Sequence, residues 1–180
     1  MKVVIINGPN LNLLGRREPA VYGTKSMEQV LLDIQRLYPD LHIHYAQSNH
    51  EGDLIDWIQA YGIARLEGSE AIGDGLLAMG NGERAMGIVL NAGGYTHTSV
   101  ALRDAVACAE IPVVEVHISD IAKRETFRQT SLLTDVCTHS IIGHGTDGYR
   151  EAVEWILGRL GEAMGRPKAY GTLAKRAIGR

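Results

Sequence analysis

The chain has 180 residues, of which 45% are apolar and 22% charged, and its formal net charge at pH 7 is −3. This composition is ordinary for a single globular domain, and the slight negative charge argues against a general nucleic-acid-binding protein. No run of about 18 apolar residues occurs, so no membrane-spanning helix is expected. The first residues lead into a strand-like run instead of the apolar core of a secretion signal, which predicts a cytoplasmic protein.

Several sequence motifs are missing. There is no H-E-x-x-H, paired C-x-x-C or D-x-D cluster, so no metal or other cofactor is expected. The fingerprints of a P-loop and a serine esterase are also missing. Cys108 and Cys137 lie in apolar segments, and we interpret them as buried free thiols rather than a disulfide.

Short apolar runs alternate along the chain with segments of helical periodicity. Strands are predicted at 3–6, 41–45, 87–91, 112–117 and 136–142. Helices are predicted at 26–37 with Ser26 as the cap, and at 51–61, 98–109 and 147–164. This alternation predicts an α/β fold in which a five-stranded parallel sheet carries helices on both faces. Ligands of such folds bind at the carboxyl ends of the strands.

Two segments do not fit the alternation. Residues 62–86 contain six glycines and an apolar patch, and we interpret them as an insertion between a helix and a strand. Residues 165–180 are basic with little apolar pattern, which is typical of an extension. The sequence therefore predicts one catalytic domain at 1–164, interrupted at 62–86, followed by a carboxyl-terminal extension.

The loop at 7–23, directly after the first predicted strand, is much longer than the 2–6 residues usual for a strand-to-helix connection. It contains Asn10, Arg17 and Tyr22 among glycines and prolines. A long loop anchored on a strand is usually functional. Arg17 near Tyr22 suggests a tyrosine whose proton can be removed near neutral pH.

Polar residues and glycines also follow the third and fourth predicted strands. Because the carboxyl ends of parallel strands lie at one edge of a sheet, these residues should meet the loop at 7–23. Glu115 lies inside the fourth strand, where a buried carboxylate needs a partner. The candidates are Asn91, Gly93, Gly94, His97, Asp104, Glu115, His117, Ile118, Ser119, Arg124 and Arg128.

Each candidate also has a purely structural interpretation. Asn10 can hold a turn, the two glycines can serve a tight strand exit, and His97 can begin a helix. His117 can be an ordinary histidine at a strand end, and Ser119 can cap a turn. Asp104 can be a surface charge, and the two arginines can form a solvated face with Glu125.

Four motifs in order resemble those of the type II 3-dehydroquinate dehydratases. They are INGPNLNLLG at 6–15 with Arg17, Glu18 and Tyr22, QSNHEG at 47–52, NAGGYTHTS at 91–99 and EVHIS at 115–119. The resemblance runs from Lys2 to about Leu160 and is interrupted by 62–86. Agreement of four ordered motifs by chance is very improbable.

The resemblance implies a flavodoxin-like fold and the anti elimination of water from 3-dehydroquinate through an enolate, without a metal or Schiff base. Tyr22 would be the base, activated by Arg17, and His117 the acid, oriented by Glu115. Asn10 would hold the water that supports the enolate, and Arg124 would belong to a lid. The substrate would be bound by Asn91, Gly93, Gly94, His97, Ile118, Ser119 and Arg128.

The family assembles as a dodecamer of trimers, so the resemblance implies a homo-oligomer in which Asp104 reaches the site of a neighbouring subunit. No nucleic acid or membrane partner is expected. Two other functions use the same residues. A binding module for a small anion would need the arginines and amides but not Tyr22 with His117, and a hydrolase would use Ser119 or Ser99 as nucleophile.

Overall fold

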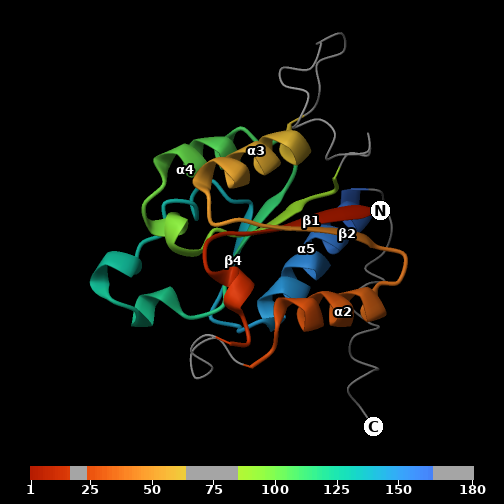
Figure 1. Ribbon diagram of the computed structural model, residues 1–180. Coiled ribbons are helices and arrows are strands. Elements are labelled where there is room, and N and C mark those ends of the chain that lie inside the picture. Colours follow the sequence, from red (N-terminus) through yellow and green to blue (C-terminus); the bar gives the residue numbers. More distant parts are fainter. Residues whose placement is uncertain (17–23, 64–84, 164–180) are drawn as a thin grey trace.

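The computed structural model of the chain describes residues 1–16, 24–63 and 85–163, with side chains to 159 (Figure 1). The strands are β1 (Lys2–Asn7), β2 (His42–Gln47), β3 (Ile88–Asn91), β4 (Val113–His117) and β5 (His139–Ile142). The α-helices are α2 (Met27–Leu37), α3 (Glu51–Gly62), α4 (Val100–Ala107) and α5 (Asp147–Ala163). Short 3₁₀ turns are η1 (Leu11–Leu13), η3 (Gly93–His97), η4 (Ile121–Lys123) and η5 (Thr126–Arg128).

All strand pairs are parallel and the sheet has the order β2-β1-β3-β4-β5. This is the doubly wound, flavodoxin-like order, which confirms the predicted fold class. The chain leaves β1 toward β2 on one side and later adds β3 on the other. The point between β1 and β3 is therefore the topological switch, where such folds bind ligands.

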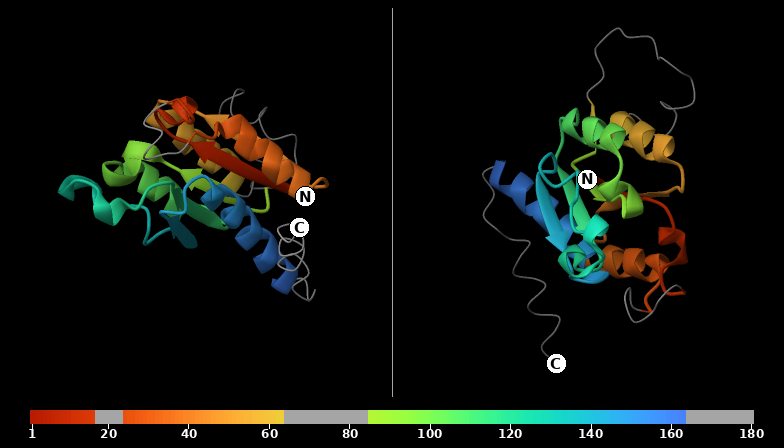
Figure 2. Two further views of the ribbon diagram at one scale, coloured as in Figure 1. Left: turned by 90° about the horizontal axis from the view of Figure 1, so that it is seen from below. Right: turned by 90° about the vertical axis from the view of Figure 1, so that its left-hand side faces the viewer.

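Side chains of β1 alternate between two apolar cores because successive residues of a strand point to opposite faces. Val3 and Ile5 pack with residues of α2 and α5, whereas Val4 and Ile6 pack with residues of α3 and α4. Figures 1 and 2 show the two helix pairs on opposite faces of the sheet. The prediction of helices on both faces is thus confirmed.

Some element boundaries differ from the sequence prediction. The fifth strand begins at His139, not at 136, because Val136 and Cys137 donate their N–H groups to the carbonyl of Leu133 in a turn. The helix expected at 98–109 is α4, whose cap is Ser99: its hydroxyl accepts the N–H of Leu102.

The two ends of the predicted insertion at 62–86 belong to the described fold. Gly62 ends α3, while Ala85 is buried and Met86 donates its N–H to the carbonyl of Lys2. Residues 64–84 and the extension at 165–180 lie outside the described residues. The domain boundaries therefore stay predictions.

Both cysteines are free, but the expectation that both are buried was wrong: Cys108 is exposed at the end of α4 and Cys137 is half-buried. Cys108 is the C-cap of α4. The helix packs one face on the core, and the exposed Cys108 lies outside that face. Burial raises the pKa of Cys137, and the nearby Glu115 carboxylate adds to the effect.

In the described part of the chain, none of the helices is long and apolar enough to span a bilayer.

Gly8 sets the distance between the loops that follow β1 and β3. Its N–H donates to the carbonyl of Asn91 at 2.7 Å. A Cβ at this position would overlap the carbonyl oxygen of Ala92. The two loops can approach this closely only because residue 8 has no side chain.

We expect Gly8→Ala to lower the free energy of unfolding by about 2 kcal/mol or more, because one of the two loops must move. The measurement is urea denaturation followed by circular dichroism. Gly52→Ala is the matched control, since a Cβ there meets nothing within 4 Å and alanine favours the helix. Equal stabilities of the two variants would contradict this account of the switch point.

Candidate functional site

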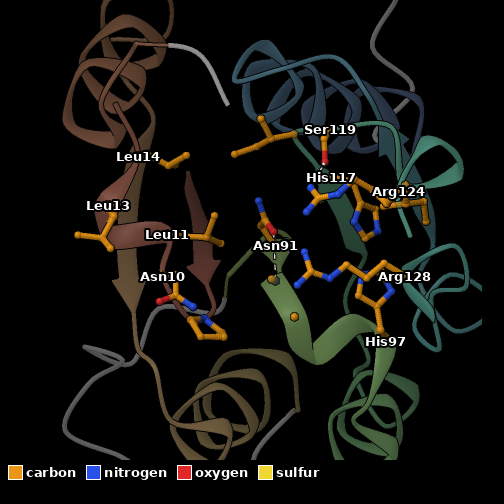
Figure 3. A pocket seen from close by; sticks show the side chains of 15 residues that line it. Asn10, Leu11, Leu13, Leu14, Asn91, His97, His117, Ser119, Arg124 and Arg128 are labelled. Carbon is orange, nitrogen blue, oxygen red and sulfur yellow. Dashed lines mark hydrogen bonds between the residues drawn. The ribbon is translucent and has the colours of Figure 1, made fainter. Parts of the chain in front are cut away.

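A cavity of about 150 Å³ opens at the carboxyl ends of β1, β3 and β4 (Figure 3). Because drug-sized ligands usually occupy 300 Å³ or more, this cavity suits a compact ligand. Ten of the residues singled out from the sequence line it: Asn10, Asn91, Gly93, Gly94, His97, His117, Ile118, Ser119, Arg124 and Arg128.

The loop after β1 forms one wall of the cavity. Asn10 has a left-handed backbone (φ 66°), which asparagine tolerates better than most residues. Its N–H donates to Oδ1 of Asn49 at 3.0 Å, so the turn interpretation holds for its backbone while the residue still lines the cavity. Leu11, Leu13 and Leu14 make this wall apolar, a role that the sequence analysis missed although all three lie inside the motif at 6–15.

Arg17 and Tyr22 fall outside the described residues. The role of Tyr22 as base and that of Arg17 as the activating cation therefore stay predictions. The loop that bears them is described as far as Arg16 and again from Thr24.

The end of β3 supplies backbone and side-chain donors. Gly93 has a positive φ of 58°, a conformation that favours glycine, and its N–H donates to Oδ1 of Asn91 at 3.2 Å. Nδ1 of His97 lies 2.8 Å from the carbonyl of Thr130. Because a carbonyl can only accept, Nδ1 carries the hydrogen, which leaves Nε2 for a ligand.

Glu115 and His117 are two positions apart on β4 and therefore point to the same face of the sheet. Nε2 of His117 lies 2.8 Å from Oε1 of Glu115. The approach is too far off line for a hydrogen bond, and this nitrogen is buried without another partner. The contact is best described as close packing of the ring against a carboxylate oxygen. It leaves Nδ1 as the ring atom available to a ligand.

Four hydroxyl groups surround the Glu115 carboxylate, which is 1% exposed. Thr96 and Ser131 donate to Oε1 at 2.7 and 2.6 Å, and Thr134 and Ser140 donate to Oε2 at 2.8 and 3.1 Å. We call these four residues the hydroxyl cage. Their four hydrogen bonds explain how a carboxylate can be buried inside a strand.

The cage and His117 keep Glu115 ionised. Burial alone would raise the pKa of the carboxyl, but His117 together with the hydroxyls of Ser131 and Thr96 outweighs it and lowers the pKa to about 2. At neutral pH a fixed negative charge therefore lies against the His117 ring. Such a charge holds an imidazole in one orientation.

Arg124 and Arg128 form the wall opposite the leucines (Figure 3). They belong to two separate turns, because Arg124 follows η4 and Arg128 ends η5. Nη1 of Arg124 donates to the Ser119 hydroxyl at 3.1 Å. The Nε atoms of Arg124 and Arg128 lie 3.5 and 3.9 Å from Oε2 of Glu125. Both arginines thus lie near Glu125 and also line the cavity, while their roles in binding stay predictions.

Asp104 is exposed on α4 and, within the described chain, is not among the residues that line the cavity. A role at a neighbouring subunit's site therefore stays a prediction for this residue. The arginines and histidines that line the cavity favour a small anionic ligand. No group of three or more His, Cys, Asp or Glu side chains suited to a metal ion occurs in the described residues.

Fold and site together define a doubly wound α/β protein with a polar cavity at its topological switch point. The family described as Dehydroquinase class II matches residues 1–157. A 3-dehydroquinate dehydratase of Halothermothrix orenii is 46% identical over 158 residues, covering 87% of this chain and 93% of that protein. One from Roseiflexus castenholzii is 41% identical, covering 96% of this chain and 99% of that protein.

Solved structures agree with these relatives. The type II dehydroquinase of Butyrivibrio crossotus has a TM-score of 0.71 and 39% identity, covering 87% of this chain and 97% of that chain. That of Propionibacterium acnes has a TM-score of 0.70 and 31% identity, covering 86% and 94%. The chain belongs to the class II dehydroquinase family, the type II 3-dehydroquinate dehydratases. The resemblance found in the motifs is thereby confirmed.

Glu115→Gln should remove a pH-dependent part of the stability. The pKa of Glu115 is lowered from 4.5 to about 2 in the folded chain, so the ionised group stabilises the fold above about pH 4.5. This contribution, up to about 3 kcal/mol, is lost as the pH falls toward 2. The stability difference between wild type and Glu115→Gln, measured by urea denaturation, should shrink over that window.

The exposed Glu28→Gln on α2 is the control, and its difference from wild type should change little with pH. A difference for Glu115→Gln that stays constant from pH 5 to the acid limit of folding would contradict the low pKa.

Proposed function

We propose that this protein dehydrates 3-dehydroquinate to 3-dehydroshikimate by anti elimination through an enolate. Membership of the family supports the reaction. The observation that carries the proposal is His117 at the cavity wall, held against an ionised, buried Glu115 and facing two arginines. A site that only bound an anion would not require a histidine with a buried carboxylate behind it.

His117 acts as the acid that protonates the departing hydroxyl group. Nε2 is placed against Glu115, so Nδ1 would deliver the proton to the substrate oxygen. The Glu115 carboxylate lies against one side of the ring, and burial of the ring, which is 8% exposed, restricts its rotation. Positioned general acids of this type contribute about 10²–10⁴ in rate.

Tyr22 removes the proton from the substrate carbon. A free phenol has a pKa near 10, so ionising it at pH 7 costs about 4 kcal/mol. A guanidinium about 4 Å away at an effective dielectric constant of about 20 supplies a similar amount, less the cost of desolvating the phenolate. Arg17, five positions earlier in the same loop, is the cation that we assign to this task.

The polar walls bind the substrate carboxylate and hydroxyls. Arg128, with Arg124 as a lid residue, neutralises the carboxylate, since a guanidinium matches a carboxylate in charge and geometry. The backbone at Gly93, Gly94 and Ile118, with the side chains of Asn91, His97 and Ser119, contacts the hydroxyl groups. Asn10 holds the water that supports the enolate oxygen.

The hydrolase alternative is disfavoured by the two serines. The Ser119 hydroxyl accepts a hydrogen bond from Arg124, which lowers its tendency to attack. Ser99 is buried and its hydroxyl caps α4. Within the described residues neither serine is hydrogen-bonded to a histidine, and a nucleophile of this kind needs an adjacent base.

We further propose a homo-oligomer built from trimers, a dodecamer, with Asp104 reaching the next subunit's site. Support comes from α4, where Asp104 is exposed and Val100 is 61% exposed. An apolar side chain beside an exposed charge suits a subunit contact. The two free cysteines support a cytoplasmic location, where thiols stay reduced.

The direct test is to add 3-dehydroquinate and follow the ultraviolet absorbance of the conjugated product. Wild type should produce it, and Tyr22→Phe should lose nearly all turnover because it has no base. Substrate affinity of the variant, measured by calorimetry, should stay within a few-fold of wild type. Tyr38→Phe, at the far end of α2, is the matched control and should keep full activity. Unchanged turnover by Tyr22→Phe would refute its role.

His117→Ala should reduce kcat by about 10²–10⁴ because the leaving hydroxyl loses its proton donor. The same absorbance assay measures it. His42→Ala, at an exposed position of β2, should leave kcat unchanged. A loss below threefold for His117→Ala would rule out the acid role.

A further inference from the structure

A second buried polar group lies beneath the cavity and has no part in the proposed chemistry so far. Tyr149 of α5 is fully buried, and its hydroxyl contacts two asparagines at the ends of β1 and β3. The hydroxyl donates to Oδ1 of Asn7 at 2.8 Å and accepts from Nδ2 of Asn91 at 2.8 Å. Nδ2 of Asn7 is in turn 3.5 Å from the Tyr45 hydroxyl.

The direction of these hydrogen bonds is set by one backbone group. The N–H of Gly93 can only donate, and it donates to Oδ1 of Asn91. The oxygen of the Asn91 amide must therefore face Gly93, and its nitrogen must face Tyr149. Since that nitrogen donates to Tyr149, the tyrosine hydrogen is directed to Asn7. Turning the Asn91 amide over would put an N–H against the N–H of Gly93.

Burial raises the pKa of Tyr149 above its ordinary value of 10, so the hydroxyl keeps its hydrogen at all pH values at which the enzyme would work. A neutral phenol can both donate and accept, as this position requires. Chains of hydrogen bonds that run in one direction strengthen each other. The hydrogen bonds of the Tyr149 hydroxyl therefore have only one direction.

The consequence for the cavity concerns Asn91, which lines it. Nδ2 carries two hydrogens, and one of them is used by Tyr149. The other is what Asn91 offers to a ligand, so this residue acts as a hydrogen-bond donor and selects an oxygen acceptor at that place. An amide free to turn would accept and donate with equal ease and would lose this selection.

We propose that Tyr149 is a positioning residue of the active site. The N–H of Gly93 sets the direction of the Asn91 amide, and the Tyr149 hydroxyl, by accepting one Nδ2 hydrogen, holds the amide in place so that the other Nδ2 hydrogen is a donor to a substrate oxygen. This inference rests on the proposed function. It assigns to Tyr149 an effect on substrate binding, not on proton transfer. Loss of a contact made equally in ground and transition states raises KM and leaves kcat unchanged.

The test is Tyr149→Phe, assayed with 3-dehydroquinate. We expect KM to rise about 3- to 10-fold, the equivalent of one hydrogen bond, while kcat changes less than about twofold. Tyr45→Phe is the matched control, because it removes a hydroxyl from the far end of the same chain without touching Asn91. An equal rise of KM in both variants would mean a general loosening of the cavity floor and would overturn the proposal.

A double-mutant cycle separates positioning from a merely structural role. If Tyr149 acts through Asn91, Tyr149→Phe should have little further effect on KM in an Asn91→Ala background. The same fold-change in both backgrounds would overturn the proposal. The cycle compares variants that all turn over 3-dehydroquinate, so an inactive wild type would instead refute the proposed function.

A measurement on the wild-type protein covers the case in which Tyr149→Phe fails to fold. In proton NMR spectra of tyrosine-labelled protein, we expect a slowly exchanging Tyr149 hydroxyl proton with contacts to the side-chain amides of Asn7 and Asn91. A Tyr149 hydroxyl with contacts to neither amide would overturn the proposal whether or not the protein is active.

Discussion

The arrangement of the site depends on a single ionised carboxylate inside the sheet, because several segments donate hydrogen bonds to it. Glu115 is nearly inaccessible to solvent, and a charge in that position must be surrounded by donors. The donors come from η3, from the turn that follows η5, and from β5. Satisfying one charge therefore connects segments that would otherwise be independent, and Oε1 of the same carboxylate lies 2.8 Å from Nε2 of His117.

The switch point supplies the second constraint. Parallel strands have donors and acceptors at their carboxyl ends that nothing in the sheet satisfies. At this point the loops after β1 and β3 come together, and Gly8 allows their backbones to touch. Gly93 then aims its N–H at Asn91, and Asn91 reaches Tyr149. A polar chain thus continues from the rim of the cavity into the core between the sheet and α5.

The two walls of the cavity differ in polarity. One wall is apolar and is built by three leucines of the loop after β1. The opposite wall carries Arg124 and Arg128, which share Glu125 at the surface. An apolar wall lowers the local dielectric constant, which strengthens the attraction of the arginines for a carboxylate.

The sequence by itself determined the α/β class, the parallel sheet and the set of polar residues at its edge, because burial on both faces and helical periodicity are written in local patterns. Its ordered motifs also determined the family. Only the tertiary structure decided the partners of Glu115, which lie 16 to 25 positions away along the chain. It also decided the direction of the Asn91 amide and placed Asp104 away from the cavity of its own chain. Serines and threonines have no periodic signal, and their role depends on which segments packing brings together.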